Sequence, residues 1–324
     1  MKLKLTALAM MLVLFSCTDD KPSSQPTQQK PVVVTPSFSG DTAYKFVAEQ
    51  VAFGPRVPNT TAHANCAVYL KEKLESYGAD VIVQEAVVTA FDGKALNMKN
   101  IIGQFSPEKK NRVMLYAHWD TRPFADKDST RQNEPIDGAN DGGSGVGVLL
   151  EVARLLHSQP ANVGVDIIFF DAEDYGAPEG VETGDYTDWC LGSQYWAEHK
   201  HVPNYRAKYG ILLDMVGSSD AVFNREGTSM ATSPMVVDKV WRTAQKLGYG
   251  GYFKDTVTPQ TVDDNYFVTV MGGIPSANIV QYHVDVLTMG YGFFHHTHKD
   301  NMDIIDPNTL KAVGQTVADC IYQD

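Results

Sequence analysis

The amino-acid sequence predicts an α/β fold, with a mostly parallel but mixed central sheet that helices flank on both faces. Three observations lead to this prediction. Three short apolar runs, at 112–117, 165–170 and 210–213, have the length and composition of buried strands. Segments with helical spacing of their apolar residues separate these runs, and strands that alternate with helices form largely parallel sheets. Two further segments, 80–91 and 100–105, flank a turn, which favours an antiparallel pair at the sheet edge.

The expected helices follow from apolar periodicity and from end signals. The first lies within 60–81 and stops at Gly78, a residue suited to a helix C-cap. The segment 233–248 has a strongly amphipathic pattern. The remaining expected helices cover 143–158, 193–200 and 306–322.

The residues that precede the expected globular domain indicate export. Residues 1–16 contain two lysines and then an uncharged apolar run, which is typical of a secretory signal and too short to span a bilayer. The stretch "LFSC" resembles a bacterial lipoprotein cleavage box and predicts lipidation of Cys17; an ordinary signal with an incidental cysteine is the alternative. Residues 17–36 are polar and predict a flexible tether to one domain over 37–324. We therefore expect a lipid-anchored protein of the cell envelope, periplasm-facing or in the outer membrane.

Composition and cysteine usage exclude several classes of protein. The formal charge is −12 and no basic run is present, so nucleic acid is not an expected partner. Apart from Cys17, the cysteines are Cys66, Cys190 and Cys320, which are widely spaced, odd in number and without a CxxC pair. They form no disulfide framework or structural zinc motif, although a single pairing stays open. Any metal is therefore expected to have mainly carboxylate and histidine ligands.

Polar residues follow each of the three predicted parallel strands. His118 and Asp120 follow the first strand, the stretch "DAED" (171–174) follows the second, and Asp214 follows the third. Because the carboxyl ends of such strands meet at one edge of the sheet, these side chains are expected to share a site. One carboxylate after a strand is more typical of a helix N-cap or a turn, but all three strand ends together indicate a ligand cluster.

Two loops are expected to complete this site. Asp141 lies in a glycine-rich turn before a predicted helix, where helix capping is the alternative role. The lysine of a phosphate-binding loop is missing there. The stretch "HHTH" offers His295, His296 and His298, of which one can complete a zinc site while the others are solvated.

The stretches "HWD", "GANDGGSG", "DAED", "LLDMVG" and "HHTHKDN", in this order, resemble the zinc aminopeptidase superfamily, which also contains the glutaminyl cyclases. The resemblance extends over nearly the whole chain after the tether, because "FGPRVPNTTAHANCAVYL" looks like the family's N-terminal motif. "EDYG", "DWCLGSQYW" and "DDNYF" are most similar to bacterial glutaminyl cyclases. Two-zinc aminopeptidases more often carry two adjacent glutamates at the first of these stretches. The implied fold is zinc aminopeptidase-like.

The resemblance implies a role for each matching position. It implies one zinc ion per chain, with Asp141, Asp174 and His296 as its protein ligands. Glu173 would be the general acid/base, and Asp214 would be a second catalytic carboxylate. Adjacent carboxylates would then have different functions, and the charge of the zinc ion would relieve their repulsion.

Further positions are expected to support the metal or the reacting amine. Asp263 is expected to act with Asp214, to which it would be hydrogen-bonded from behind. Asp264 could take this place instead, and either aspartate could be a helix N-cap. His118 matches a position at which aminopeptidases hold their second zinc, and Asp120 belongs to the same motif. Both are therefore candidates for a second metal or for support of the first.

The remaining candidates concern the pocket wall and the core. Trp189 is the candidate lid, and His295 is a candidate substrate contact where animal cyclases carry tryptophan. Asn265 replaces a histidine that commonly follows the paired aspartates. Asp171 is expected to be structural, and Trp196 is expected to lie in the core.

The implied activity is glutaminyl-peptide cyclotransferase, an acyltransferase that converts the N-terminal glutamine of peptides or proteins to pyroglutamate and releases ammonia. A monomer that meets the membrane only through its lipid is expected. One alternative is a secreted aminopeptidase that activates water between two metals. Another is a metal-free binding or scaffold lipoprotein, which would be expected to have broken ligand positions, whereas each one is filled here.

Overall fold

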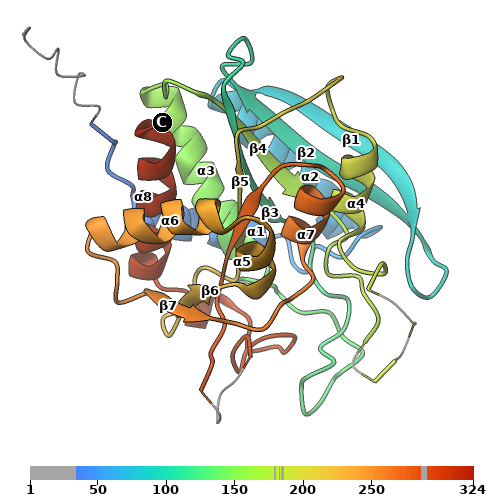
Figure 1. The fold of residues 1–324 in the computed structure, drawn as a ribbon. Coiled ribbons are helices and arrows are strands. Elements are labelled where there is room, and N and C mark those ends of the chain that lie inside the picture. The colour runs from blue at the N-terminus through green and yellow to red at the C-terminus, as the bar shows by residue number, and fades with distance from the viewer. Residues whose placement is uncertain (1–33, 179, 182, 184–185, 286–289) are drawn as a thin grey trace, which may run out of the picture. The chain divides into compact units, whose positions relative to one another are not determined.

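The computed structural model describes residues 34–178, 180–181, 183, 186–285 and 290–324 (Figure 1). The predicted signal segment, Cys17 and most of the predicted tether lie outside these residues. The elements in chain order are α1 (Gly40–Val51), α2 (Thr61–Ser76), β1 (Asp80–Thr89), β2 (Ala95–Phe105), β3 (Arg112–His118), α3 (Gly143–Ser158), β4 (Gly164–Phe170), α4 (Leu191–Glu198), β5 (Gly210–Asp214), β6 (Phe223–Arg225), α5 (Gly227–Thr232), α6 (Pro234–Lys246), β7 (Phe253–Val257), α7 (Asp264–Val270), β8 (Ser276–Val280), the 3₁₀ turn η1 (Met302–Ile304) and α8 (Pro307–Tyr322).

Six strands form the central sheet in the order β1-β2-β4-β3-β5-β8. The strands β4, β3, β5 and β8 run parallel to one another. β1 pairs with β2, and β2 with β4, in antiparallel register, so the predicted antiparallel pair does lie at the edge. The prediction of a mostly parallel, mixed sheet is confirmed.

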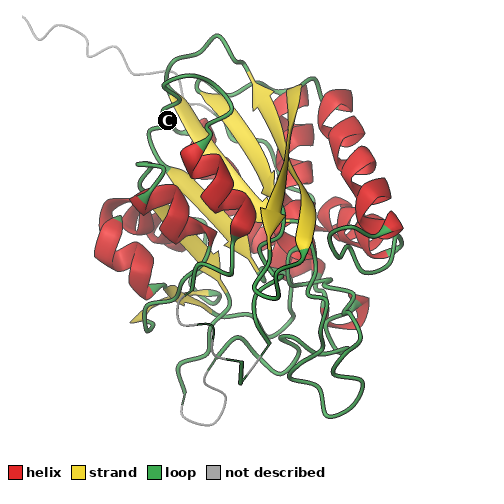
Figure 2. Cartoon of the chain, turned by 90° about the vertical axis from the view of Figure 1, so that its right-hand side faces the viewer, coloured by secondary structure: helices red, strands yellow, loops and turns green. Residues whose placement is uncertain are grey.

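Helices cover both faces of this sheet (Figure 2). α3 packs on β3 and β5, with α1 and α8 beside it, while α4 and α7 cover the opposite face. Gly145 permits the close approach of α3, because a Cβ atom there would lie 2.2 Å from the carbonyl oxygen of Leu213. Every residue of β3, β4 and β5 is buried, which explains why these strands are mostly apolar on both faces rather than alternating.

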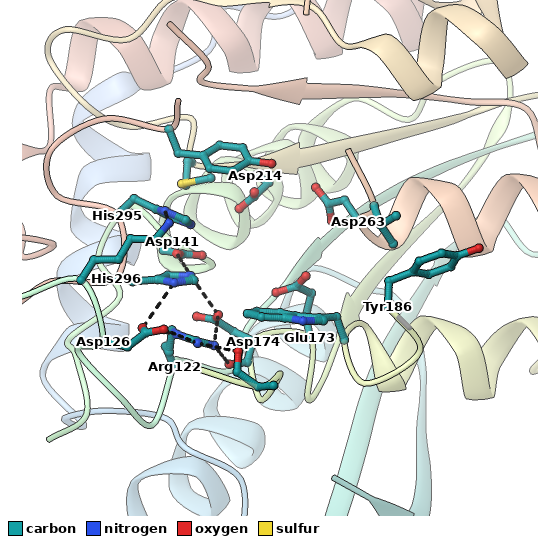
Figure 3. A pocket seen from close by; sticks show the side chains of 16 residues that line it. Arg122, Asp126, Asp141, Glu173, Asp174, Tyr186, Asp214, Asp263, His295 and His296 are labelled. Atoms are coloured by element: carbon teal, nitrogen blue, oxygen red, sulfur yellow. Dashed lines mark hydrogen bonds and ion pairs between the residues drawn. The ribbon is translucent and has the colours of Figure 1, made fainter. Parts of the chain in front are cut away.

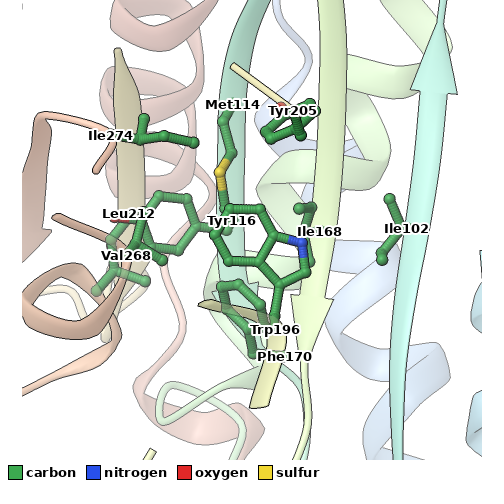
Figure 4. Close-up of a cluster of buried hydrophobic side chains, with 10 residues drawn as sticks. All are labelled: Ile102, Met114, Tyr116, Ile168, Phe170, Trp196, Tyr205, Leu212, Val268 and Ile274. Atoms are coloured by element: carbon green, nitrogen blue, oxygen red, sulfur yellow. The ribbon is translucent and has the colours of Figure 1, made fainter. Parts of the chain in front are cut away.

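A cluster of buried side chains joins the sheet to α4 and α7 (Figure 4). Tyr116 of β3 and Phe170 of β4 meet edge to face, with ring centroids 5.7 Å apart. Trp196 of α4 lies 5.9 Å from Phe170 and is fully buried, so its predicted place in the core is confirmed. Truncation of such a buried aromatic side chain to alanine costs about 3–5 kcal/mol. This packing holds the strand ends, and hence the polar residues that follow them, in fixed positions.

The predicted helices are observed as α2, α3, α4, α6 and α8. α2 ends at Ser76, and Gly78 adopts a φ of 81°, the left-handed conformation that commonly terminates a helix. The sequence did not predict β8, because Ser276 and Asn278 interrupt its short apolar run. No helix within the described residues is both long and apolar enough to cross a bilayer.

Candidate active site

A pocket of about 420 Å³ lies at the carboxyl edge of the parallel strands (Figure 3). Five separate segments of the chain supply the sequence-predicted acidic and histidine residues of its lining. They are the loop after β4, the end of β5, the turn before α3, the residue before α7 and the loop after β8. The corresponding residues are Glu173 and Asp174, Asp214, Asp141, Asp263, and His295 and His296. The topology therefore brings these sequence-predicted residues together, as a shared strand edge requires.

His296 lies between two aspartates at the inner end of this pocket. Its Nε2 atom is 3.3 Å from Asp174 Oδ1 and 3.8 Å from Asp141 Oδ2. Ligand atoms bound to one tetrahedral zinc at about 2.0–2.2 Å are separated by roughly 3.3–3.6 Å. His295 also places a ring nitrogen within 4.8 Å of the ligand atoms of Asp141 and His296. The spacing of these groups therefore fits a divalent cation.

His118 forms a second polar cluster that shares Asp141 with the first. Its Nε2 atom is 3.0 Å from Asp141 Oδ1 and 3.3 Å from Asp214 Oδ1. Burial alone would lower the pKa of the His118 imidazole, but the carboxylates of Asp120, Asp141 and Asp214 outweigh it and raise the pKa well above its ordinary value. These groups can hold either a shared proton or a second cation.

The carboxylate beside His296 is only partly compensated by the protein, because Arg122 lies 3.5 Å from Asp174 Oδ1 and also pairs with Asp126. Burial, together with the nearby Asp141, raises the pKa of Asp174 well above its ordinary value. Among the described residues, Asp174 Oδ2 has no hydrogen-bond partner, although it is buried. A buried ionised carboxylate is costly unless it is paired or coordinates a metal. The donor set and the unsatisfied oxygen both fit a bound cation.

Glu173 points into the same pocket, one residue before Asp174. Burial raises the pKa of its carboxyl well above the ordinary value, and Asp263 and Asp174 add to the effect. The thiol of Cys190 donates a hydrogen bond to Glu173 Oε1 at 3.1 Å, which restricts the orientation of the carboxyl. A carboxyl with a raised pKa is a stronger base than an ordinary one and can return the proton that it accepts.

Asp120 supports this loop through its backbone. Its two carboxylate oxygens accept the N–H groups of Glu173 and Asp174 at 3.0 and 3.2 Å. It also lies 3.6 Å from His118 Nδ1. Asp120 thus has contacts with both polar clusters but is not among the residues that line the pocket.

The structure separates the three candidate histidines. Burial lowers the pKa of His296 well below its ordinary value, and Arg122 and Lys127 lower it further, so the ring is neutral with a free lone pair. The ring of His295 stacks on that of His296 at 3.7 Å, and its Nδ1 atom is 2.7 Å from Lys127 Nζ. His298 instead bonds to Asp128 and does not line the pocket.

Asp263 has both of the roles considered for it, a helix cap and a residue of the pocket. Asp263 is the N-cap of α7 and also lines the pocket, while Oδ2 of its carboxylate accepts a hydrogen bond from Asn278 at 2.7 Å. Among the described residues, neither Asp263 nor Asp264 is hydrogen-bonded to Asp214. The other oxygen of Asp263 accepts the backbone N–H of Asp264 at 2.6 Å, so both of its carboxylate oxygens are engaged by other donors.

Trp189 forms one wall of the pocket. Its ring is parallel to that of His296, with centroids 6.1 Å apart and an interplanar angle of 6°. The guanidinium of Arg122 lies over the indole at 4.7 Å. The side chain is therefore held between the metal-binding loop and an arginine.

Asp171, which the sequence assigned to structure, is buried one residue beyond β4. It accepts hydrogen bonds from His63 Nε2, at 2.8 Å to Oδ2, and from the backbone of Lys99. Arg122 and Tyr291, in contrast, line the pocket but were not predicted. An arginine two residues after "HWD" was an available signal, whereas nothing in the sequence around Tyr291 distinguishes it.

The model of peptidase family M28 matches residues 100–321, which carry all of the clusters described above. The chain belongs to peptidase family M28. This confirms the resemblance to the zinc aminopeptidase superfamily. Membership also accounts for the observed sheet, with its active-site edge formed by β3, β4 and β5.

Solved structures are similar to this protein along almost the whole chain. A glutaminyl cyclase of Tannerella forsythia is 51% identical with a TM-score of 0.87, covering 89% of this chain and 100% of that chain. A Zn-dependent exopeptidase of Parabacteroides distasonis is 51% identical with a TM-score of 0.86, covering 90% of this chain and 100% of that chain. The similarity to bacterial glutaminyl cyclases inferred from the motifs is thus confirmed.

Curated relatives match over a shorter part of their length. Aminopeptidase YwaD of Bacillus subtilis is 29% identical over 231 residues, which are 69% of this chain and 44% of the relative. The chain thus spans less than half of that protein.

Proposed function

We propose that this M28-family protein is a zinc-dependent glutaminyl-peptide cyclotransferase. The observation that carries the proposal is the 51% identity with a glutaminyl cyclase along 89% of this chain and all of that one. The pocket supports it, because a half-buried Glu173 stands beside a cluster that can bind a cation. The substrates in this proposal are peptides or proteins that begin with glutamine, and the protein acts as a monomer.

One zinc ion per chain would be held by Asp141, Asp174 and His296. These side chains provide two anionic oxygens and one neutral imidazole nitrogen, a set that leaves one coordination position for substrate. When bound, the ion supplies Lewis-acid polarisation of the side-chain amide of the substrate glutamine.

Glu173 would move the proton of the reaction. In cyclisation, the α-amine nitrogen forms a bond to the side-chain amide carbon, and the bond from that carbon to the amide nitrogen breaks. The attacking amine loses one proton, and the departing nitrogen gains one to leave as ammonia. A carboxyl group with a raised pKa at the pocket floor suits both transfers, and such catalysis contributes roughly 10²–10⁴-fold in rate.

The other pocket residues would hold the folded glutamine and exclude water. Asp214 and Asp263 face the pocket and are placed to accept hydrogen bonds from the α-amine. Trp189 and His295 form apolar and aromatic walls, with Trp189 as the cover over the bound side chain. Because nucleophile and electrophile belong to one molecule, exclusion of water protects the amide from hydrolysis.

A two-metal aminopeptidase is the second candidate, and one observation favours it. His118, Asp141 and Asp214 have ligand atoms within 4.8 Å of one another, so they can hold a second cation next to the first. The exopeptidase relative at 51% identity is consistent with this arrangement.

The deciding experiment incubates purified protein with a glutamine-initiated dipeptide. We expect ammonia to appear in step with loss of the free amine, and one zinc ion per chain by elemental analysis. Metal-stripped protein is the control and should release no ammonia until zinc is restored. Free amino acids with two zinc ions per chain would establish the aminopeptidase instead.

We further propose that Cys17 anchors the exported protein to a cell-envelope membrane. The support is the charged start, the apolar run and "LFSC" ahead of a polar segment. Cys17→Ser should move the protein from the membrane to the soluble fraction. The intact mass of membrane-extracted wild type provides the check, since a signal-cleaved chain without added lipid would contradict acylation.

A further inference from the structure

Two buried aspartates hold backbone loops of the active site in the same way. Asp120 accepts the N–H groups of Glu173 and Asp174 with its two oxygens. Asp300 accepts the N–H groups of two other successive residues, Asn140 at 2.7 Å and Asp141 at 3.0 Å. In each pair, the second N–H belongs to a residue that we assign to the metal.

Asp300 connects two loops that are far apart in the sequence. It lies 159 residues after Asp141 along the chain and four residues after His296. Its own N–H donates to the carbonyl of Thr297 at 3.1 Å, so Asp300 belongs to the same tight turn as His296. The two hydrogen bonds from Asp300 therefore tie the loop of one proposed ligand to the turn of another.

The loop around Asp141 depends on such external contacts. Gly138 and Gly142 have φ angles of 57° and 78°, a left-handed conformation that glycine adopts at little cost. A chain so rich in glycine does not by itself select one conformation. Arg56 binds the carbonyl of Gly138 at 2.8 Å on one side of the loop, and Asp300 binds the N–H groups on the other.

Asp300 has no direct part in metal binding or chemistry. It is fully buried and is not among the residues that line the pocket. Both of its carboxylate oxygens are engaged by backbone N–H groups. The hydrogen bonds of Asp300 therefore reach the proposed metal site through the loop that carries Asp141.

We propose that Asp300 is a positioning residue that sets the spacing of Asp141 and His296, and thereby the zinc affinity of the site. The inference rests on the proposed zinc ligands. Groups that orient metal ligands without touching the metal typically change metal affinity by about 10–100-fold when they are replaced.

Asp300→Asn is the direct test because it preserves size. The amide retains one accepting oxygen but turns an NH₂ group toward the second backbone N–H, which removes one hydrogen bond and opposes two donors. We expect the zinc dissociation constant, measured by competition with a chelator, to rise about 10–100-fold. Turnover at saturating zinc should stay within a few-fold of wild type, since no pocket group has changed.

Asp128→Asn is the matched control. Asp128 holds the same turn through the N–H and ring of His298, at 3.0 and 2.8 Å, but has no contact with Asp141. The Asp128→Asn variant should bind zinc with the affinity of wild type. A loss as large as that of Asp300→Asn would assign the effect to general loosening of the turn and overturn the proposal.

Two further variants separate the possible failures. Asp141→Asn, in the same assay, should lose zinc; if it retains wild-type affinity, the proposed ligand set is wrong. If Asp141→Asn loses zinc while Asp300→Asn binds like wild type, the inference about Asp300 alone is wrong. Should Asp300→Asn fail to fold, Asp300→Glu keeps both acceptors at a longer reach. Weakened zinc binding in folded Asp300→Glu supports the proposal, and unchanged binding overturns it.

Discussion

The two ends of strand β4 bury acidic side chains under very different conditions. Asp166, near its beginning, is fully buried and accepts hydrogen bonds from Arg112 Nη2 at 2.6 Å, Arg112 Nε at 2.7 Å and Tyr205 Oη at 2.6 Å. Charge and hydrogen-bonding capacity are thus satisfied within the protein. Such a buried ion pair is a structural feature of the sheet.

The carboxyl end of β4 is not compensated in this way. Arg122 lies 3.5 Å from Asp174 Oδ1, but its Nε and Nη2 atoms already donate to Asp126 at 2.7 and 2.8 Å. Within the described part of the chain, Glu173 forms no ion pair with lysine or arginine. Burial of acids is therefore common to both ends. The end that fits a metal differs in having no close, bidentate partner such as Arg112: Asp174 has only the longer ion pair with Arg122, which is shared with Asp126.

The largest expected effects come from substituting Glu173 and Asp174, which should fail in different ways. Glu173→Gln keeps shape but removes the proton carrier, so turnover should fall by roughly 10²–10⁴-fold with zinc content near wild type. Asp174→Asn replaces an anionic ligand with a weak neutral one, so zinc should be lost or readily chelated. Elemental analysis beside turnover on a glutamine-initiated peptide measures both. Equal zinc loss in the two variants would show that Glu173 also binds the metal and would contradict its assignment as proton carrier alone.

The next comparison tests which histidine belongs to the metal cluster. His296→Ala should abolish zinc binding and activity while the far-ultraviolet circular dichroism stays native. His298→Ala, in the same turn, should retain zinc because His298 bonds to Asp128 outside the pocket. Full zinc content in His296→Ala would move the assignment to His295, whose ring nitrogen is also within reach of Asp141.

The compensated end of β4 should respond in stability rather than in metal content. Arg112→Gln leaves Asp166 buried without its cation, which should lower the free energy of unfolding by about 3–5 kcal/mol. Zinc stoichiometry and turnover of the remaining folded protein should stay near wild type. Denaturant unfolding measures the first quantity, and a substantial loss of zinc would show that the two ends of β4 are not independent.

The smallest effect concerns pH and Asp264 beside the carboxyl end of β4. Burial raises the pKa of this carboxyl to about 7 from an ordinary 3.8. The folded state therefore keeps a proton that the unfolded state loses, so the contribution of Asp264 to stability is full below pH 3.8. This contribution falls as the pH rises and is lost above about 7.

The matching variant is Asp264→Asn, compared with wild type as metal-free protein. Its stability relative to wild type should rise between pH 5 and pH 8, by roughly a few kcal/mol at most, since one pKa unit corresponds to about 1.4 kcal/mol. Denaturant titrations at the two pH values measure the difference. A relative stability that does not change with pH would show that Asp264 is ionised in the fold.

The sequence by itself determined the sheet and the edge at which chemistry occurs. Buried parallel strands must be apolar on both faces, so 112–117, 165–170 and 210–213 were recognisable without contacts from elsewhere. The polar residues after each strand had to meet, because the strands are parallel. Motif order then implied the family, which the M28 match confirms.

Only the tertiary structure decided the contacts between distant loops. The family resemblance pointed to His296, but the spacing of "HHTHKDN" gives no physical reason to prefer it to His298. The turn that directs one ring toward Asp174 and the other toward Asp128 is the product of packing. The same is true of Asp300, whose carboxylate meets the N–H groups of a loop 159 residues earlier. Periodicity and spacing report which face of an element is buried, since that depends on neighbours in sequence. Which buried carboxylate receives a protein cation depends on atoms that the chain brings together only when it folds.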